Sequence, residues 1–330
     1  MPAARTPLEV ITQATEALPV VRAWCAIDAS HAIPRRVELL RRKRKSLVYR
    51  LVGVGVGGSD VIAKACAPET AFVERTVYAD VLPRLPVTQL GYYGFAESAG
   101  AEFSWLFLED ARGAEFAPDN PEHRELATRW LATLHVASGS LAPPPPVPER
   151  GTAHYRDHMR QARAAITENY ENPAFGKDEH QTLDRILTLF AFAESKWPEI
   201  EALCNGMPHA LIHADFAERN VQIRPAVDGT AGATLVAFDW EVAGWGPPVV
   251  DLAHADLQLY WSLVRDHWCC LEFGTLRRLI HVGGLLRGGI AATNWSAPSL
   301  TTPWPEKAIR NMKVYDRRMT AAIRGLGWAT

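Results

Sequence analysis

The chain has 330 residues, which is more than one small hydrophobic core needs and fits either two lobes or one large domain with insertions. Hydrophobic residues make up 48% and charged residues 22%, and the net charge is −2, so the composition is globular and gives no sign of a nucleic-acid partner. The five cysteines are scattered without a Cys-x-x-Cys pair, which argues against a disulfide framework and against a cysteine-rich zinc site.

Targeting signals are not visible in the sequence. The first residues lack the apolar stretch of a secretory signal, and no run approaches the roughly 18 apolar residues of a membrane span. We therefore expect a cytoplasmic protein that binds neither membrane nor nucleic acid.

After a first helical segment, residues 35–110 have the pattern of a small, mostly antiparallel sheet with one helix. Short apolar runs bounded by glycine-rich turns predict strands, and apolar residues at helical spacing predict helices. The predicted elements in chain order are a helix at 8–27, strands at 47–56 and 61–66, a helix at 68–82, and strands at about 91–96 and 103–108.

The remainder is mostly helical in pattern, with one exception. Two apolar runs, 221–223 and 234–238, flank a turn-rich segment and predict a second hairpin. We expect an α+β fold with a β-rich N-terminal lobe at 1–110 and a larger, mostly helical C-terminal lobe at 111–330. Helices are predicted at about 121–137, 151–170 and 179–197, and from residue 247 to the end.

The candidate catalytic and metal-binding residues lie at the two ends of the second hairpin. The motif His-x-Asp-x-x-x-x-Asn at 213–220 precedes the first strand, and Asp239 follows the second strand. Phosphoryl transfer to an alcohol needs a carboxylate beside the attacking hydroxyl, oxygen ligands for Mg²⁺ and a cation on the phosphates. The spacing puts Asp215 and Asn220 on one loop, and the hairpin returns Asp239 beside them. Carboxylate and amide oxygens suit Mg²⁺.

Here the sequence resembles the aminoglycoside phosphotransferase and choline-kinase-like family, which has a protein-kinase-like fold. The resemblance covers about residues 35–255 and rests on the loop motif and on the Phe-Asp-Trp-Glu sequence at 238–241. Ala214 stands where glycine is usual in the family. Trp-Glu after the aspartate is similar to the small-molecule kinases, because protein kinases carry Phe-Gly there.

The resemblance implies roles for the residues of the motif. Asp215 would be the catalytic base, and Asn220 and Asp239 would hold Mg²⁺. His213 would orient the loop, and Asp251 resembles the aspartate that braces the loop from the start of a helix. The phosphate donor would be ATP or GTP.

Residues of the N-terminal lobe would bind the nucleotide. Lys64, in Val-Ile-Ala-Lys, looks like the strand lysine that holds the α- and β-phosphates. Glu74 is favoured over Glu69 as its partner, because the apolar stripe of the helix shares the face of Glu74. The phosphate-facing loop is predicted at 42–46. Ser46, Glu109 and Ala111 complete the predicted nucleotide site, the last two through the connector's backbone.

The basic run at 41–45 lacks the glycines that let backbone amides approach phosphate. It could hold phosphate directly, it could be a solvated charge run, or it could be a small nucleic-acid patch. The literal Gly-x-Gly-x-x-Gly at 53–58 is not a dinucleotide fingerprint, because a turn and a strand follow it where a helix is required.

The acceptor site is expected in the C-terminal helices. Tryptophan faces bind apolar rings, sugar faces or quaternary ammonium groups. From residue 261 to 330 the sequence has ten Lys and Arg against four acidic residues, which counts against a highly cationic acceptor. The candidate acceptor-site residues are Glu241, Asp256, Trp245 and Trp261.

Three functions remain open at this point. The first is an ATP- or GTP-dependent kinase, monomeric or homodimeric, that phosphorylates a hydroxyl of an antibiotic or similar natural product. The second is a choline- or ethanolamine-type metabolite kinase. The third, a pseudokinase that only binds, would have lost the base, a metal ligand or the lysine, and all are present. A protein kinase is disfavoured, because 241–251 leaves no room for a long activation loop.

Overall fold

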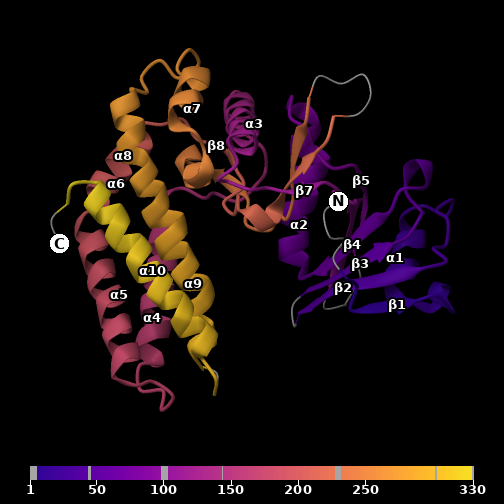
Figure 1. Ribbon diagram of the computed structural model, residues 1–330, viewed down its shortest axis with the longest axis horizontal. Coiled ribbons are helices and arrows are strands. Elements are labelled where there is room, and N and C mark those ends of the chain that lie inside the picture. Colours follow the sequence, from indigo (N-terminus) through magenta and orange to yellow (C-terminus); the bar gives the residue numbers. More distant parts are fainter. Residues whose placement is uncertain are drawn as a thin grey trace. The chain divides into compact units, whose positions relative to one another are not determined.

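The computed structural model describes residues 6–43, 46–97, 103–142, 144–226, 232–301 and 303–328 (Figure 1). Two compact units make up the chain. The first comprises Met1–Leu126, Ala142–Val147 and Asp215–Ala243, and the second Ala127–Leu141, Pro148–Ala214 and Gly244–Thr330. The first unit therefore contains the second hairpin as well as the segment expected to form the N-terminal lobe.

A six-stranded antiparallel sheet is the centre of the first unit (Figure 1). Its strand order is β1-β2-β3-β4-β6-β5, so that β4 lies inside the sheet between β3 and β6. The strands are β1 (Glu9–Ile11), β2 (Val37–Lys43), β3 (Ser46–Leu51), β4 (Val61–Cys66), β5 (Tyr92–Ala96) and β6 (Ser104–Glu109).

The prediction of one helix at 8–27 is wrong in its first half. Glu9–Ile11 forms the edge strand β1, which pairs with Val37–Leu39, and the helix α1 starts only at Pro19 and ends at Ile27. Proline at the first helical position explains the start, because it has no N–H to donate and its φ suits a helix. The residues before it form the edge strand and a short 3₁₀ turn at Thr15–Ala17, and Leu8 and Val10 are exposed.

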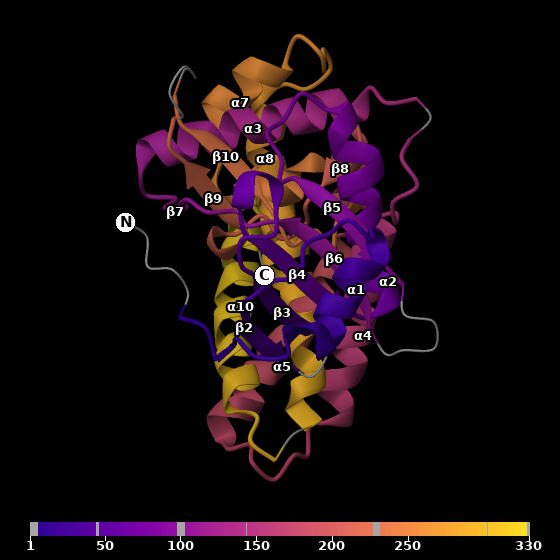
Figure 2. The same cartoon turned by 90° about the vertical axis from the view of Figure 1, so that its right-hand side faces the viewer.

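The two faces of the sheet are covered by different helices. In β4 the alternate residues Val61, Ala63 and Ala65 belong to a buried cluster with Val20, Val21 and Trp24 of α1. The intervening Lys64 therefore points to the other face, where α2 (Pro68–Thr76) packs and continues as a π-helical turn at Val77–Val81. Figure 2 shows both helices from the side.

The hairpin of the first unit consists of β9 (Val221–Arg224) and β10 (Thr234–Ala237), as predicted. β7 (Ala114–Glu115) adds a third strand to it. The Thr88 hydroxyl donates to the carbonyl of Leu235, which ties the hairpin to the segment that precedes β5. Phe238 N–H donates to the carbonyl of Asn220 at 2.9 Å, so the residue before Asp239 lies opposite Asn220.

The second unit is mainly helical, with the short strand pair β8 (Ala210–Ile212) and β11 (Gly244–Gly246). α10 packs on α5 and on the π-helical turn Gly284–Ala291. No helix within the described residues is both long and apolar enough to cross a membrane. The α-helices are α3 (Pro121–Gly139, which begins in the first unit), α4 (Thr152–Glu168), α5 (Lys177–Ser195), α6 (Trp197–Asn205), α7 (Leu257–Val264), α8 (Phe273–Gly283), α9 (Ala292–Ser296) and α10 (Glu306–Gly325).

Candidate active site

The catalytic-loop motif begins where β8 ends, and a buried carboxylate holds its first residues. Asp251, in the 3₁₀ helix Pro248–His254, accepts hydrogen bonds from the backbone N–H of His213 at 2.7 Å and of Ala214 at 2.8 Å. His213 and Asp251 are almost completely buried. Without this carboxylate the two N–H groups would be unpaired in the core, at a cost of about 1–3 kcal/mol each.

A second buried histidine supports Asp251. His135 of α3 places Nε2 3.4 Å from Asp251 Oδ2, and its Nδ1 lies 2.9 Å from the hydroxyl of Tyr260. His135 is fully buried, so it is a core residue whose ring nitrogens have partners within the fold.

Ala214 adopts a left-handed backbone conformation, with φ of 58°. An L-residue pays about 1–2 kcal/mol for this region, whereas glycine enters it freely. The turn therefore explains physically why glycine suits this position. Here alanine occupies it, and its carbonyl accepts a hydrogen bond from Arg287 Nε.

Asp215, the predicted base, is held by two neighbours on its own loop. The Asn220 amide donates to Asp215 Oδ2 at 2.9 Å and to the Asp215 backbone carbonyl at 3.0 Å. Arg219 forms an ion pair with the same oxygen at 2.5 Å. The loop motif thus forms one hydrogen-bonded group in which the carboxylate of Asp215 has a fixed direction.

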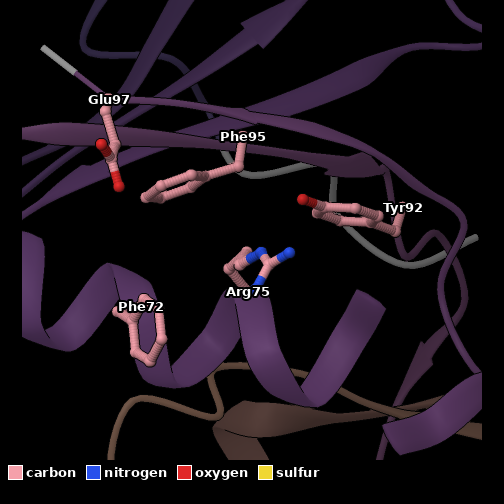
Figure 3. A pocket seen from close by; sticks show the side chains of 5 residues that line it. All are labelled: Phe72, Arg75, Tyr92, Phe95 and Glu97. Atoms are coloured by element: carbon pink, nitrogen blue, oxygen red, sulfur yellow. The ribbon is translucent and has the colours of Figure 1, made fainter. Parts of the chain in front are cut away.

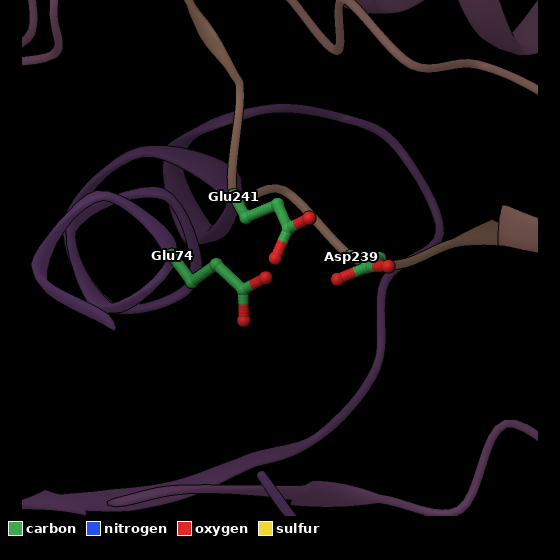
Figure 4. A group of neighbouring side chains, drawn as sticks. All are labelled: Glu74, Asp239 and Glu241. Carbon is green, nitrogen blue, oxygen red and sulfur yellow. The ribbon is translucent and has the colours of Figure 1, made fainter. Parts of the chain in front are cut away.

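Lys64 forms ion pairs with three carboxylates. Figure 4 shows these three side chains, of Glu74, Asp239 and Glu241, as neighbours. Its Nζ is 2.5 Å from Glu74 Oε1 and 3.2 Å from Glu241 Oε2, and it contacts Asp239 Oδ1. The lysine pairs with Glu74 of α2, as the helical stripe indicated, while Glu69 lies exposed in the first turn of that helix. Asp239 has a φ of 69°, a turn that brings its side chain and that of Glu241 to the lysine.

Burial and charge act in opposite directions on this group. Burial alone would lower the pKa of Lys64, but the carboxylates of Glu74, Asp239 and Glu241 raise it well above its ordinary value. Burial raises the pKa of Glu74 to about 7, although the ammonium of Lys64 opposes this, and the other two carboxylates add to the rise. Lys64 is therefore positively charged at neutral pH, and that charge lowers the pKa of the Glu74 carboxyl against the effect of burial.

The donor set near Asp239 fits a hard divalent cation. Oxygens of Glu74, Asp239 and Glu241 lie within 4.8 Å of one another. The backbone of Asn220 pairs with that of Phe238, the residue before Asp239. Carboxylate and amide oxygens are the ligands that Mg²⁺ takes, usually with several waters. In this structure the single ammonium of Lys64 offsets part of the negative charge of the three carboxylates.

The connector after β6 offers backbone groups. The N–H of Glu109 donates to the carbonyl of Gly91 at 2.8 Å, and the carbonyl of Ala111 accepts from Arg224 Nε at 2.8 Å. The side chain of Glu109 forms an ion pair with Arg224 at 3.0 Å. The N–H of Ala111 makes no hydrogen bond with any residue that the structure describes.

The predicted phosphate-facing loop lies between β2 and β3. Ser46 is the first residue of β3 and pairs with Lys43 and Cys66. The turn itself, Arg44 and Lys45, falls outside the described residues. That the basic run faces phosphate therefore stays a prediction.

The four candidate acceptor-site residues lie in different surroundings. Glu241 belongs to the group around Lys64 in the first unit, whereas the other three are in the second unit. Asp256 caps α7 by accepting from the N–H of Leu259 at 3.0 Å. Trp261 packs its ring on Phe273 and Trp245 is half-buried in β11.

Sequence reasoning missed three contacts. The ion pair of Arg219 with Asp215 was visible as a basic residue four positions after the base. Glu241 follows Asp239 by two positions, but only the left-handed turn at Asp239 reveals that both reach Lys64. The bond from Arg287 to Ala214 spans 73 positions and leaves no local signal.

A pocket of about 350 Å³ lies elsewhere in the first unit, between α2 and β5 (Figure 3). It shares α2 with Glu74 but shares no residue with the group around Lys64. Its lining consists of Phe72, Arg75, Tyr92, Phe95 and Glu97.

Comparison with known proteins identifies the family. Residues 40–269 match the model of the phosphotransferase enzyme family. A search of curated proteins gives no match.

Solved structures share the fold. An ethanolamine kinase from Plasmodium vivax is 15% identical, with 87% of this chain and 82% of that chain covered and a TM-score of 0.52. A mutant aminoglycoside 2′-phosphotransferase IIIa in complex with GDP is 11% identical, with 92% and 97% covered and a TM-score of 0.59. An aminoglycoside phosphotransferase in complex with GDP and kanamycin is 12% identical, with 93% and 97% covered and a TM-score of 0.52.

At such identities the likeness is one of fold, and it confirms the prediction of an α+β, protein-kinase-like fold. The family match covers more than half of the chain and includes the loop motif, Asp239 and the lysine strand. The protein therefore belongs to the phosphotransferase enzyme family and is a small-molecule kinase.

Proposed function

We propose that this kinase transfers the γ-phosphate of ATP or GTP to a hydroxyl group of a small natural product such as an antibiotic, with Asp215 as the catalytic base. The observation that carries the proposal is the pair of side-chain groups in the first unit: Asp215 fixed by Asn220, and Lys64 beside Asp239. Together they supply the proton acceptor, the oxygen ligands and the cation that phosphoryl transfer to an alcohol requires.

The proposed role of Asp215 is to take the proton of the attacking hydroxyl. Asn220 and Arg219 both contact Oδ2, so they hold the carboxylate in one orientation. A fixed base lowers the entropic part of the barrier, because the acceptor hydroxyl meets it in one direction only.

Lys64 has the proposed role of gripping the α- and β-phosphates, with Glu74 fixing its direction from α2. Asn220 and Asp239 would hold Mg²⁺, which neutralises charge on the phosphates when it is bound. The N–H of Ala111, which has no partner among the described residues, would donate to the purine, and Ser46 would lie near the phosphates.

A choline- or ethanolamine-type kinase is the second candidate. The likeness to an ethanolamine kinase favours it as much as the likeness to aminoglycoside phosphotransferases favours the first, because all these matches lie between 11% and 17% identity. A non-catalytic binding module is the less favoured third candidate, because the base, both metal ligands and the lysine are all present.

The deciding experiment measures ADP or GDP release by the purified protein with Mg²⁺. The acceptor panel contains aminoglycosides, macrolides, nucleoside antibiotics, sugars, choline and ethanolamine. We expect at least one acceptor to stimulate release in the native protein but not in Asp215→Ala, while Mg·nucleotide affinity stays nearly unchanged in that variant. Equal turnover in Asp215→Ala would remove Asp215 from its role.

A companion variant tests the nucleotide side. Lys64→Ala should raise the nucleotide KM at least tenfold, which corresponds to the free energy of about one charge-assisted hydrogen bond. An unchanged nucleotide KM would contradict the role of the lysine. Arg310→Gln, an exposed change on α10, serves as the control for loss of one positive charge.

A further inference from the structure

The turn between α7 and α8 carries two cysteines that are adjacent in the sequence (Figure 1). Cys269 and Cys270 are the central residues of this turn, in which the N–H of Leu271 donates to the carbonyl of Trp268 at 2.9 Å. Both thiols are exposed and free, and their sulfur atoms lie 3.8 Å apart. We call this pair the vicinal dithiol.

The residues on both sides of the vicinal dithiol anchor the turn. The side chains of Trp268 and Leu271 are buried. Trp261 of α7 donates through Nε1 to the carbonyl of Leu271 at 3.1 Å, and the N–H of Trp268 donates to the carbonyl of Val264 at 2.9 Å. The backbone before and after the two thiols is therefore tied to α7, while the thiols themselves reach solvent.

The other cysteines lie in different surroundings. Cys66 and Cys204 are buried, and burial raises the pKa of each thiol to about 12, so both are inert at neutral pH. Cys25 of α1 is half-buried. Of the five cysteines, all of which the structure describes, only Cys269 and Cys270 present two exposed thiols to one ligand.

A disulfide is a poor product for this pair. The Cα atoms of disulfide-bonded cysteines are usually about 4.4–6.8 Å apart. Neighbouring Cα atoms are only about 3.8 Å apart across a trans peptide bond. A bond between the two sulfurs would therefore be strained and easily reduced.

A single atom between the two sulfurs fits the turn better. An atom about 2.3 Å from each sulfur, the length of a zinc–thiolate bond, holds two sulfurs roughly 3.5–3.8 Å apart at bond angles of about 100–110°. The observed separation of 3.8 Å agrees with this span. Cysteine sulfur prefers soft, thiophilic atoms, so the turn is shaped for one such atom with a bond to each thiol.

The number of nearby ligands selects among thiophilic atoms. Within the described residues, the one group of three or more His, Cys, Asp or Glu side chains whose ligand atoms lie within 4.8 Å of one another is Glu74, Asp239 and Glu241. The vicinal dithiol thus has no third ligand of these types in the described chain. Zn²⁺ takes four ligands and would lack two here. Trivalent arsenic makes three bonds and carries its third group with it.

The protonation of the pair agrees with a chelating dithiol. The hydrogen bond with Cys269, and then the charge of Cys269, raise the pKa of Cys270. Cys270 is therefore no thiolate of lowered pKa, which is the form that catalytic cysteines take.

We propose that the vicinal dithiol is a covalent binding site for trivalent arsenicals. Each sulfur forms one bond to arsenic, the bonds between arsenic and its oxide oxygen break, and the two thiol protons leave with that oxygen as water. Arsenic and sulfur keep their oxidation states, so no oxidant or reductant takes part. The site lies in the second unit and shares no residue with the proposed active site, so the inference is independent of the proposed function.

The test uses phenylarsine oxide and the whole protein, reduced and then freed of reductant. Free thiols are counted with a colorimetric disulfide reagent, and the intact mass is measured. We expect one phenylarsine group per chain and the loss of two thiols. Dithiothreitol should release the group, and 2-mercaptoethanol at equal thiol concentration should not, because only a second dithiol can replace both bonds.

Variants locate the site. Cys269→Ser and Cys270→Ser should each weaken binding at least about a hundredfold, because the second bond to arsenic is intramolecular and is lost in either variant. Cys25→Ser is the matched control and should bind as the native protein does. Circular dichroism checks that each variant is folded, which the exposure of both thiols favours.

Four results would overturn the proposal, whether or not the protein is an active kinase. They are the absence of binding to the native protein, undiminished binding to the double variant Cys269→Ser/Cys270→Ser, two phenylarsine groups on the vicinal dithiol, and equal affinity in a single variant and the native protein. A bond between Cys269 and Cys270 that 2-mercaptoethanol fails to reduce, visible as a mass lower by two hydrogens, would also contradict it.

Discussion

At the scale of single residues, the charge on Glu74 is set first by its burial and then by the charges around it. Its side chain is fully buried, and its carboxyl is a weaker acid in the folded protein than in the unfolded chain, with a pKa of about 7 against an ordinary 4.5. A raised pKa of an acid means that the folded state binds the proton more tightly. The contribution to stability is then complete below pH 4.5 and is lost as the pH rises through 7.

We therefore predict that Glu74→Gln flattens the pH dependence of stability between pH 4.5 and 7. The native protein should lose on the order of 3 kcal/mol of unfolding free energy from this carboxyl over that interval, and the variant should not. Chemical denaturation at several pH values measures the difference. Glu69→Gln, an exposed change on the same helix, should follow the native curve, and an identical curve for Glu74→Gln would contradict the assignment.

Ala214 supplies a second prediction at this scale. Glycine would relieve the left-handed backbone but would also remove a buried methyl group, and these effects are each about 1 kcal/mol and opposite in sign. Ala214→Gly should therefore change the unfolding free energy by less than about 1 kcal/mol. Ala214→Val should cost about 3 kcal/mol, because a β-branched residue is strained at this φ and overfills the core. Equal stability of the two variants in urea would refute this account of the turn.

At the scale of elements, local patterns predicted most of the helices and strands. The hairpin of β9 and β10 and the pairing of β3 with β4 followed from apolar runs around turn residues. The segment 8–27 failed because strand β1 exists only through its pairing with Val37–Leu39, a contact that no local window contains. The same reason hid Arg287, whereas Asp215 and Asn220 were accessible because one loop carries both.

Asp251 connects the 3₁₀ helix Pro248–His254 to the segment that follows β8. Its removal should measure how much unfolding free energy this connection contributes. Asp251→Ala leaves two buried N–H groups and His135 without their acceptor, so we predict a loss of about 3–5 kcal/mol of unfolding free energy. Turnover should fall as well, because the loop before Asp215 loses its brace. Asp157→Asn, an exposed change on α4, is the control for the loss of one negative charge. A cost below 1 kcal/mol would show that the brace is dispensable.

The cap of α7 gives a smaller effect at the same scale. Asp256 accepts a hydrogen bond from the N–H of Leu259, a contact that typically contributes about 1 kcal/mol. Asp256→Ala should lose this amount, whereas Asp256→Asn should keep most of it, because asparagine caps as well as aspartate. Denaturant midpoints of the two variants test the cap, and a raised acceptor KM in Asp256→Asn alone would reveal a separate use of the charge.

At the scale of the whole molecule, the residues proposed to hold the nucleotide all belong to the first unit. They lie on β3, β4, α2, the connector after β6 and the β9–β10 hairpin. The second unit contributes the brace of the loop, Asp251. Nucleotide binding should therefore protect segments of the first unit from hydrogen exchange and leave the helices of the second unit nearly unchanged.

Amide hydrogen exchange measures this protection, because local opening becomes rarer where a ligand binds only the closed form. A ligand at a hundredfold excess over its Kd adds about 2.7 kcal/mol to the opening free energy of the segments that must be closed to bind it.

Mg·ATP or Mg·GTP should accordingly slow exchange in β4, α2 and the β9–β10 hairpin, and leave α5 and α10 nearly unchanged. Asp215→Ala should show the same pattern, since the base is not needed for nucleotide binding, while Asp239→Asn should lose the Mg²⁺-dependent part. Protection by nucleotide confined to α5 and α10 would move the nucleotide site out of the first unit and contradict the roles of Lys64 and Asp239 together.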